Sequence, residues 1–449
     1  MTQTASPLSH LTRLDENAAD DLMSPDERLA SLEEALSQST SPEDEAALVE
    51  RLCAKHMRRV HDDGLLLYAG CNEISGACRR MLSSGLGGLP AMGRPGKKDQ
   101  PGTAEISALE VLVERQLLSI FGGAFAEARL PSCTMCNAAL YETFAGRGGT
   151  IAALGSASGA HISSQGHGTP RLAGSTVIEL PFDPDSFDID IPRALPLLDM
   201  RRPPLVIIGA SVSLRALSVR EIAACCHSYG GVLAVDVAHI AGLIAGKRMP
   251  NPLSEGADFI TGSTYKSLGG PPGGFLIGAS RQYEDQLRDV VCPVMTSNYD
   301  SARIAALAVA LAETKRYMPD YAAAMIANAS ALTDSCEGAG LSVVRVPRNP
   351  FPTHQLIISA GDRTLSAALV RDAERVGIIL GSNATPGRPG DYCLRLGTQV
   401  LTRRGMGRVE MGVVADMLKK VFRGDTTPAL GRQVRELTKP YQTIHYGFA

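Results

Sequence analysis

Two side chains that could act together, a carboxylate and an amine, each follow an apolar stretch of the chain. Asp236 comes directly after Val232–Val235, and Lys266 lies in a Ser/Thr-rich turn after Phe259–Thr261. A Gly/Pro-rich loop, Gly269–Gly274, follows the lysine. Taken singly, such features are usually a helix cap, a surface charge and a turn. Together they favour one shared site, because the carboxyl ends of parallel strands open onto one crevice.

This set of residues suits one cofactor, pyridoxal phosphate (PLP). A PLP site needs a lysine that forms a Schiff base, a carboxylate that keeps the ring nitrogen protonated, and small hydroxyl residues for the phosphate. Glycines let the backbone approach the cofactor closely. The sequence therefore predicts a PLP-dependent enzyme with Lys266 as its Schiff-base lysine and Asp236 as the partner of the ring nitrogen.

The elements that must position these residues alternate along the chain from about residue 105. Continuous β-branched runs separated by helical stretches indicate a mostly parallel sheet covered by helices. An Ala-rich helical region follows, and a smaller α+β part completes the chain. The predicted strands are Thr150–Leu154, Leu205–Ile208, Val232–Val235, Phe259–Thr261, Gly274–Ile277, Leu341–Val346 and His354–Ile358; the late helical stretches are Ala305–Arg316 and Tyr321–Cys336; Pro347–Pro350 is predicted to be a loop.

A chain of 449 residues is longer than one hydrophobic core usually spans. We expect an N-terminal arm over residues 1–64, a large PLP-binding domain over 65–305 and a small C-terminal domain over 306–449. Within the arm, Ser24-Pro25 and Ser41-Pro42 are predicted helix starts.

The bulk composition excludes several classes of protein. A formal net charge of −3 gives no polycation for nucleic acid or for an anionic membrane surface. No apolar run approaches the roughly 20 residues of a membrane span, and residues 1–20 lack the pattern of a signal peptide. Ten irregularly spaced cysteines fit free thiols in a reducing compartment, so a cytoplasmic location is expected.

The block around Asp236 and Lys266 resembles the serine hydroxymethyltransferase family of fold-type I PLP enzymes. The resemblance runs from about residue 65 to the C-terminus and includes Asn251-Pro252 and the run Leu394–Gly405. It implies an α/β fold with a mostly parallel, seven-stranded type of sheet covered by helices and a smaller C-terminal α+β domain. Because such enzymes build their sites at a subunit interface, it also implies a homodimer or homotetramer.

The resemblance implies a role for several individual residues. Lys266 and Asp236 keep the roles given above, His239 is expected near the cofactor O3′, and His161 is expected to stack on the ring. Arg395 would bind the substrate α-carboxylate, which a guanidinium fork suits well. The other residues expected at the cofactor or substrate are Ser132, Cys133, Thr134, Ser211, Ser213 and Tyr265.

Cys133-x-x-Cys136 and the pair His161 and His167 could instead bind a metal ion or, for the cysteines, act in redox chemistry. No second cysteine pair stands at zinc spacing, and no carboxylate is placed beside the histidines. The resemblance explains the location of Cys133 by the family's phosphate-binding turn, ahead of a helix N-terminus that suits a phosphate. We expect no metal.

The sequence departs from the family in two segments near the start of the large domain. Ala69-Gly70-Cys71-Asn72 stands where the family has Ala-Ser-Glu-Asn, and Leu89–Gly102 lacks a family glutamate and several tyrosines. The glutamate, which handles protons during folate-dependent transfer, maps onto Met92. Its loss argues against folate, so tetrahydrofolate is kept only as an alternative cofactor. The tyrosines map onto Pro90, Asp99 and Gln100.

Four further segments resemble the L-threonine transaldolase branch of these enzymes. This branch releases acetaldehyde from threonine and adds a second aldehyde to the remaining glycyl unit, so the expected partners are a small amino acid and an aldehyde. His161, or a water that it holds, is the base expected in place of the missing glutamate. The four segments are Ser211–Leu217, Cys292–Asn298, Thr353–Gln355 and Thr402–Met406.

Other functions stay open from the sequence. One alternative is a folate-dependent hydroxymethyltransferase for serine or an α-methylserine-like substrate. Another is a different fold-type I enzyme, such as an aminotransferase or a decarboxylase. A third is a binding or regulatory module that keeps the PLP fold, against which the intact set of Asp236, Lys266 and Arg395 argues.

Overall fold

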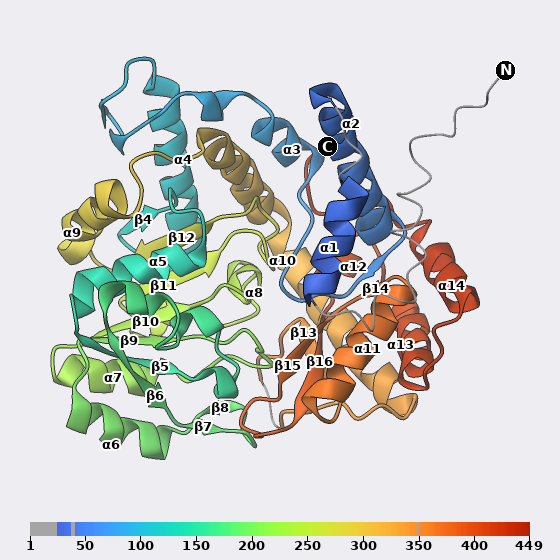
Figure 1. The fold of residues 1–449 in the computed structure, drawn as a ribbon. Helices are drawn as coiled ribbons and strands as arrows, with labels where there is room; N and C mark the ends of the chain where they lie inside the picture. The colour runs from blue at the N-terminus through green and yellow to red at the C-terminus, as the bar shows by residue number, and fades with distance from the viewer. Residues whose placement is uncertain (1–24, 37–40, 348–349) are drawn as a thin grey trace.

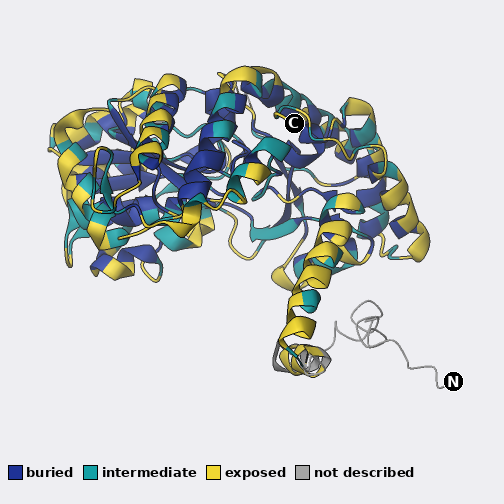
Figure 2. Cartoon of the chain, turned by 90° about the horizontal axis from the view of Figure 1, so that it is seen from above, coloured by how far each residue is buried: buried dark blue, intermediate teal, exposed yellow. Residues whose placement is uncertain are grey.

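The computed structural model describes residues 25–36, 41–347 and 350–449 (Figure 1). Helices α1 (Pro25–Leu36) and α2 (Pro42–His56) begin at the two expected prolines. Ser41 caps α2, because its side chain accepts a hydrogen bond from the N–H of Asp44 at 3.1 Å. Figure 2 shows this helical segment extending from the rest of the molecule. The remainder of the predicted arm, residues 1–24 and 37–40, lies outside the described residues, as do Arg348 and Asn349 of the predicted loop.

A seven-stranded sheet forms the centre of the larger half of the molecule (Figure 1). Only β12 runs against its neighbours in this sheet, and the remaining adjacent pairs are parallel, so the predicted mostly parallel sheet is confirmed. Two of its strands, β4 and β6, were not predicted. In spatial order the strands are β4 (Phe125–Glu127), β12 (Gly274–Gly278), β11 (Phe259–Ser263), β10 (Val232–Asp236), β9 (Leu205–Ile208), β5 (Thr150–Leu154) and β6 (Thr176–Leu180).

Helices cover both faces of this sheet because alternate residues of its strands point to opposite sides. In β9, Val206 and Ile208 pack with α4, α6, α7, α8 and α10, whereas Leu205 and Ile207 pack with α5 and α9. The covering helices are α4 (Ala104–Phe121), α5 (Cys133–Leu140), α6 (Ile191–Arg201), α7 (Arg220–Ser228), α8 (Ala241–Ala245), α9 (Glu284–Asp289) and α10 (Ser301–Gly338).

A second, three-stranded antiparallel sheet lies beside the first, with its own apolar core (Figure 1). Its strand β13 (Gln355–Ser359) confirms the predicted strand at His354–Ile358. The strand predicted over Leu341–Val346 is wrong, because only Val343 makes a β-bridge, to Ile358. The other elements here are β15 (Gly381–Ala384), β16 (Tyr392–Gly397), α11 (Arg363–Arg375), α12 (Gln399–Arg403), α13 (Arg408–Phe422) and α14 (Pro428–Thr438).

Helix α10 replaces the two helical stretches predicted for this region with one continuous helix of 38 residues. It contacts α3 (Gly76–Leu82) and α4 of the larger half and α12 and α13 of the smaller one. It also passes through the expected limit at residue 305, and the domain limits stay predictions. The remaining strands are short and form three small pairs: β1 (Leu65–Leu66) with β14 (Ile378–Ile379), β2 (Gly93–Arg94) with β3 (Lys97–Lys98), and β7 (Phe182–Asp183) with β8 (Asp188–Ile189).

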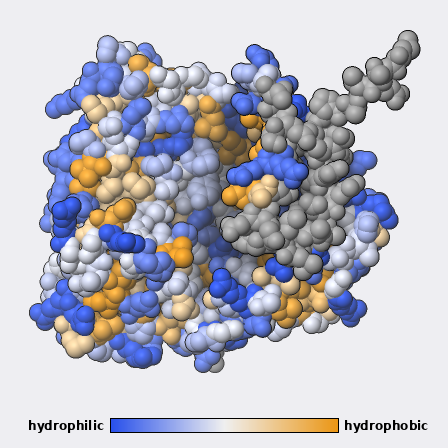
Figure 3. Space-filling view, viewed as in Figure 1, coloured by the Kyte–Doolittle hydropathy of each residue, from blue (hydrophilic) through white to orange (hydrophobic). Residues whose placement is uncertain are grey.

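On the face drawn in Figure 3, hydrophobic residues lie in several separate patches among hydrophilic ones. No helix in the described part of the chain has the length and apolar character needed to cross a membrane. All ten cysteines are free thiols, of which six are buried, three partly buried and one, Cys53 on α2, exposed.

Candidate active site

A pocket of about 690 Å³ lies at the carboxyl ends of β5, β9, β10 and β11. This edge is where open parallel sheets bind ligands. A second cavity adjoins the pocket and shares several of its residues, while adding Tyr68, Asn383 and Arg395. The predicted residues that line the first pocket are Ser132, Cys133, Thr134, His161, Ser211, Asp236, His239, Tyr265 and Lys266.

Lys266 ends a chain of hydrogen bonds that fixes its neighbour, His239. The N–H of Ser213 donates to Gln355 Oε1 at 3.2 Å, so the amide nitrogen of Gln355 faces His239 and donates to its Nδ1 at 3.2 Å. Because Nδ1 is an acceptor, neutral His239 carries its proton on Nε2, which lies 3.1 Å from Lys266 Nζ. His239 can therefore donate to the lysine amine.

The pKa shifts of His239 and Lys266 are consistent with a hydrogen bond that His239 donates to the lysine amine. Burial lowers the pKa of His239 well below its usual value, and the nearby Lys266 and Arg395 add to the shift. Burial also lowers the pKa of Lys266, although Asp236 partly opposes the change. Both shifts favour neutral side chains, and a neutral amine is the nucleophile that Schiff-base formation needs.

Asp236 ends β10 and is held by two donors. Its Oδ2 accepts from Asn137 Nδ2 at 2.8 Å, and its Oδ1 accepts from the N–H of Ala238 at 2.9 Å. Thr261 donates to the amide oxygen of Asn137 at 2.6 Å, which fixes the orientation of that amide. We did not predict Asn137. Its one sequence signal is its position four residues after Cys133, one turn along the same helix.

The predicted phosphate turn forms the start of helix α5. Ser132 is its N-cap, with Oγ accepting from the N–H of Met135 at 3.2 Å, and Thr134 lines the pocket. Backbone N–H groups at a helix start suit an anion. The start of β12 approaches closely, because a Cβ on Gly274 would lie 2.4 Å from the carbonyl oxygen of Ser132.

Burial raises the pKa of Cys133 well above its usual value and also raises that of Cys136. Both thiols therefore stay protonated and are poor metal ligands or nucleophiles at neutral pH. Within the described residues, no group of three or more histidine, cysteine or acidic side chains is arranged to hold a metal ion.

His161 lies on the loop after β5 and lines both cavities. Its Nδ1 makes two contacts with Ser163, at 2.7 Å to Oγ and at 3.2 Å to the backbone N–H. Partial burial and the nearby Lys266 lower the pKa of His161, which keeps the ring neutral near pH 7. Because Nδ1 is occupied, Nε2 is the ring nitrogen that can meet a ligand.

Arg395 and Tyr265 lie on the side of the second cavity. Arg395 is buried on β16, and its Nη1 donates to the carbonyl oxygen of Ser211 at 2.8 Å. Its Nε has no hydrogen-bond partner in the described structure. Tyr265 places its ring centroid 5.9 Å from Lys266 Nζ, and burial raises the pKa of its phenol. A buried guanidinium with a free N–H fits a carboxylate ligand.

One predicted residue is not brought to the pocket. Ser213 is buried behind it, where its Oγ donates to the carbonyl oxygen of Arg215 at 3.3 Å and its N–H holds Gln355. Its geometry supports a place in the hydrogen-bond chain to His239 rather than direct contact with a cofactor. Gln355 itself, although part of a segment that we singled out, was not predicted as a site residue.

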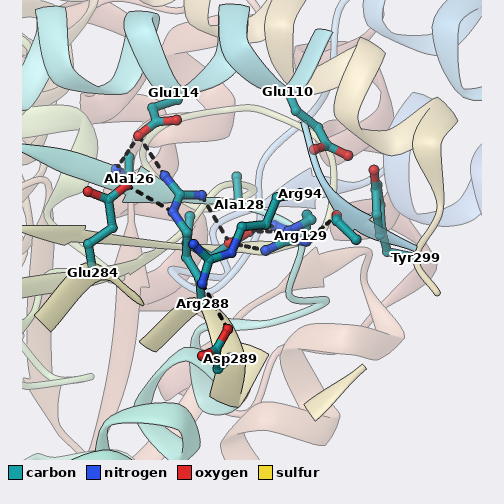
Figure 4. A network of polar contacts seen from close by, with 12 residues as sticks. Arg94, Glu110, Glu114, Ala126, Ala128, Arg129, Glu284, Arg288, Asp289 and Tyr299 are labelled. Carbon is teal, nitrogen blue, oxygen red and sulfur yellow. Dashed lines mark hydrogen bonds and ion pairs between the residues drawn. The ribbon is translucent and has the colours of Figure 1, made fainter. Parts of the chain in front are cut away.

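The segment that lacks the family glutamate forms the hairpin of β2 and β3, away from both cavities. Lys98 fastens the hairpin, donating to Glu110 at 2.6 Å and to the carbonyl oxygen of Gly93 at 2.9 Å. Figure 4 shows the surrounding network, in which Arg94 pairs with Asp289 at 2.8 Å. The mapped positions Pro90, Met92, Asp99 and Gln100 line neither cavity of this chain.

The residues present fit PLP. The pocket is lined by the buried amine of Lys266, by the carboxylate of Asp236, which two donors fix, and by the start of helix α5. The guanidinium of Arg395 lies beside them in the second cavity, with an N–H that has no partner in the described structure. The amine suits the cofactor's aldehyde, the carboxylate its ring nitrogen and the helix start its phosphate. The guanidinium suits the carboxylate of an amino acid.

Comparison with known proteins gives a consistent result. A model of the serine hydroxymethyltransferase family matches residues 43–418. An α-methylserine aldolase from Variovorax paradoxus is 33% identical over 405 residues, covering 89% of this chain and 92% of the relative. A serine hydroxymethyltransferase from Pyrobaculum islandicum is 34% identical over 393 residues, covering 85% and 90%.

A solved structure, that of L-threonine transaldolase from Pseudomonas fluorescens, superimposes with a TM-score of 0.83 at 26% identity and covers 90% of this chain and 95% of its own. Fold, pocket and relatives agree on a PLP-dependent enzyme of the transferase or aldolase type. The chain belongs to the serine hydroxymethyltransferase family.

Proposed function

We propose that the protein is an L-threonine transaldolase, which converts threonine and a second aldehyde into acetaldehyde and a new β-hydroxy-α-amino acid. The observation that carries the proposal is the structural likeness to the Pseudomonas fluorescens transaldolase, at a TM-score of 0.83 over 90% of this chain. The loss of the family glutamate at Met92 adds support, because exchange of aldehydes needs no folate. Bound PLP would supply the electron-withdrawing ring that makes cleavage at the Cα atom accessible.

The side chains divide the remaining work. Arg395 would bind the α-carboxylate and so orient the bonds at Cα. Lys266 would hold the cofactor and, as an amine of lowered pKa, can give up and recover a proton at Nζ. His239 donates to that nitrogen from Nε2, and Asp236 would accept a hydrogen bond from the protonated ring nitrogen of the cofactor.

His161 is the proposed base. As the Cα–Cβ bond breaks, the imidazole of His161 takes the proton of the threonine β-hydroxyl. The same proton returns to the oxygen of the incoming aldehyde when the new Cα–Cβ bond forms, so the base ends the cycle unchanged. A water held by His161 could carry the proton over a longer distance.

The proposal extends to partners and setting. The substrates are a small amino acid and an aldehyde, tetrahydrofolate takes no part, and the enzyme works in the cytoplasm as a homodimer or homotetramer. Ser132, Cys133 and Thr134 would hold the cofactor phosphate at the start of α5, and Ser211 and Tyr265 would line the cofactor and substrate sides of the pocket.

The test is to incubate the PLP-loaded enzyme with L-threonine and measure acetaldehyde with and without benzaldehyde as acceptor. We expect acetaldehyde release to rise with benzaldehyde, with a matching amount of β-hydroxy-α-amino acid. Equal release without an acceptor would assign a simple aldolase instead. Glycine formation from L-serine only with tetrahydrofolate would assign a hydroxymethyltransferase.

A second candidate function follows from the Variovorax relative, an α-methylserine aldolase at 33% identity. In that reaction the same Cα–Cβ cleavage would convert α-methylserine into formaldehyde and alanine. Incubation with α-methylserine alone distinguishes it, because a transaldolase for threonine should release little formaldehyde from that substrate.

A further inference from the structure

Tyr68 projects into the substrate side of the site from a segment that carries none of the predicted residues. It lines the second cavity together with Arg395, Tyr265 and Lys266. The Cζ of Arg395 lies 5.7 Å from the centroid of the Tyr68 ring. At that distance an arginine is attracted to an aromatic ring.

The backbone of Tyr68 is fastened to the strand that bears Arg395. Tyr68 forms a β-bridge with Leu396, the residue after Arg395. The amide of Gln399, in α12, donates to the carbonyl oxygens of both Tyr68 and Cys71 at 2.8 Å. The phenol and the guanidinium are therefore held on a common framework.

Two glycines make room for the ring. A Cβ on Gly70 would lie 2.7 Å from Tyr68 Cε1, and a Cβ on Gly381 would lie 2.9 Å from Tyr68 Cε2. The ring thus fits between two backbones on either edge, and any larger residue at either position would displace it. Gly70 is the position at which the family has the serine of Ala-Ser-Glu-Asn, so the departure in this sequence is what admits the ring.

We propose that Tyr68 is a positioning residue for Arg395: its ring, admitted by Gly70 and Gly381, holds the guanidinium plane so that its free N–H groups face the substrate carboxylate. Arg395 donates from Nη1 to the carbonyl oxygen of Ser211 at 2.8 Å and has a side-chain hydrogen bond with Tyr68, while its Nε has no partner in the described structure. The ring face of Tyr68 limits how far the guanidinium can turn about its anchor on Ser211. The inference rests on the proposed binding of the α-carboxylate by Arg395.

The test compares glycine with methylamine, which has the amine of glycine but no carboxylate. Binding of each to the PLP-loaded enzyme is followed by the change in visible absorbance, and cofactor content and Tm are measured for every variant. Tyr68→Ala should raise the Kd for glycine about tenfold, which is the upper range of an aromatic–cation contact, and leave methylamine unchanged. Tyr68→Phe keeps the ring and should bind glycine within about twofold of the unaltered enzyme.

Substitutions of Gly70 and Gly381 test the same proposal independently. Gly70→Ala and Gly381→Ala should each weaken glycine binding as Tyr68→Ala does, and neither should weaken it further when combined with Tyr68→Ala. Gly88→Ala is the matched control, because a Cβ there meets nothing within 4 Å.

Three results would overturn the inference: unchanged glycine affinity in Tyr68→Ala, equal loss for glycine and methylamine, or additive losses in the double variants. These measurements need no transaldolase turnover. A failure of the threonine reaction therefore leaves the inference standing, and a failure of this test leaves the reaction standing.

Discussion

The hydrogen-bond chain from Ser213 through Gln355 and His239 to Lys266 sets a direction for each proton in it. Burial lowers the pKa of both His239 and Lys266, which favours the neutral form of each group in this chain of hydrogen bonds. A single amide, that of Gln355, decides which nitrogen of His239 faces the lysine with a proton. Replacing that amide should therefore change the chemistry without changing the shape of the pocket.

Gln355→Glu places a carboxylate beside Nδ1 of His239. An opposite charge raises the pKa of a histidine, so His239 should become cationic as the pH falls through a value closer to neutrality. Because protonated His239 repels a protonated Lys266, the acid limb of the kcat–pH profile should move to higher pH. Gln355→Leu, which adds no charge, should lower kcat about tenfold without moving that limb. An unmoved acid limb in Gln355→Glu would contradict the chain.

Lys266→Ala should abolish the visible absorbance of covalently held cofactor and reduce turnover by at least about a thousandfold, because no other amine lines the pocket in the described residues. Absorbance spectra and acetaldehyde release check both. Lys97→Ala, an exposed lysine on β3, is the control and should behave as the unaltered enzyme. A coloured, active Lys266→Ala variant would refute the assignment.

At the residue scale, the candidate catalytic side chains could be predicted from the sequence, whereas the amide side chains that orient them could not. Lys266, Asp236 and His161 meet in one pocket as expected. Asn137 and Gln355, which hold Asp236 and His239, stand 99 and 116 positions from their partners. Asparagine and glutamine are common, and no sequence pattern marks the ones that bind a buried side chain. Only the folded structure shows which amide donates to a buried carboxylate or imidazole.

Among the elements, the junction of β12 and α5 brings two backbones into contact. A Cβ on Gly274 would meet the carbonyl carbon and oxygen of Ser132 at 2.4 Å and the nitrogen of Cys133 at 2.7 Å. All of these atoms are backbone, so the start of α5 would have to move. The phosphate turn therefore depends on a residue in a different element.

Gly274→Ala should weaken PLP binding about tenfold or more and destabilise the fold by about 1–3 kcal/mol through overpacking. Fluorescence or absorbance titration of the cofactor-free protein with PLP measures the first effect, and thermal unfolding measures the second. Gly166→Ala, where a Cβ meets nothing within 4 Å, should leave both unchanged. Normal PLP affinity in Gly274→Ala would show that the turn tolerates the shift.

Predicted elements were accurate where burial on both faces gives a continuous apolar run. Thr150–Leu154 and Leu205–Ile208 match β5 and β9. Strand β6 (Thr176–Leu180) was not predicted, because it lies at the edge of the sheet and is only partly buried. Leu341–Val346 misled because its apolar residues are mostly half-exposed and only one of them makes a bridge.

For the whole molecule, a buried ion cluster at Glu73 joins two segments that lie far apart in the sequence. Arg404, directly after α12, donates to both carboxylate oxygens at 3.0 and 2.6 Å, and His61 Nδ1 lies 2.7 Å from Oε1. Burial alone would raise the pKa of Glu73, but these two partners lower it to about 2. A folded-state pKa below the ordinary value of 4.5 means that the carboxylate stabilises the fold above that pH.

Glu73→Gln should lower the free energy of unfolding at pH 7 by about 3–5 kcal/mol, since it leaves a buried arginine unpaired. The difference from the unaltered protein should shrink as the pH falls from about 4.5 toward about 2, where Glu73 itself takes up a proton. Denaturant unfolding at several pH values measures it. Glu374→Gln, which breaks a half-exposed pair with Arg59, is the control and should cost under about 1 kcal/mol. A pH-independent difference would contradict the assigned protonation.

The overall arrangement, a mostly parallel sheet covered by helices, was accessible from sequence because the family resemblance spans most of the chain. The position of the hairpin of β2 and β3 was not. The sequence showed only that this segment lacks the family glutamate, whereas its position is set by hydrogen bonds from Lys98 and Arg129 to the carbonyl oxygen of Gly93. These two cations stand 5 and 36 positions from Gly93 in the sequence, so no short sequence motif predicts the contact.

The single exposed thiol of the described chain, Cys53, has a practical consequence. It lies on α2, the helix that extends from the body (Figure 2), while the other nine cysteines are buried or partly buried. A maleimide spin label or fluorophore should therefore attach there first, with no engineered cysteine. Paired labels on an assembled oligomer would then report the distance between the α2 helices of neighbouring subunits, and so the number of subunits and their symmetry.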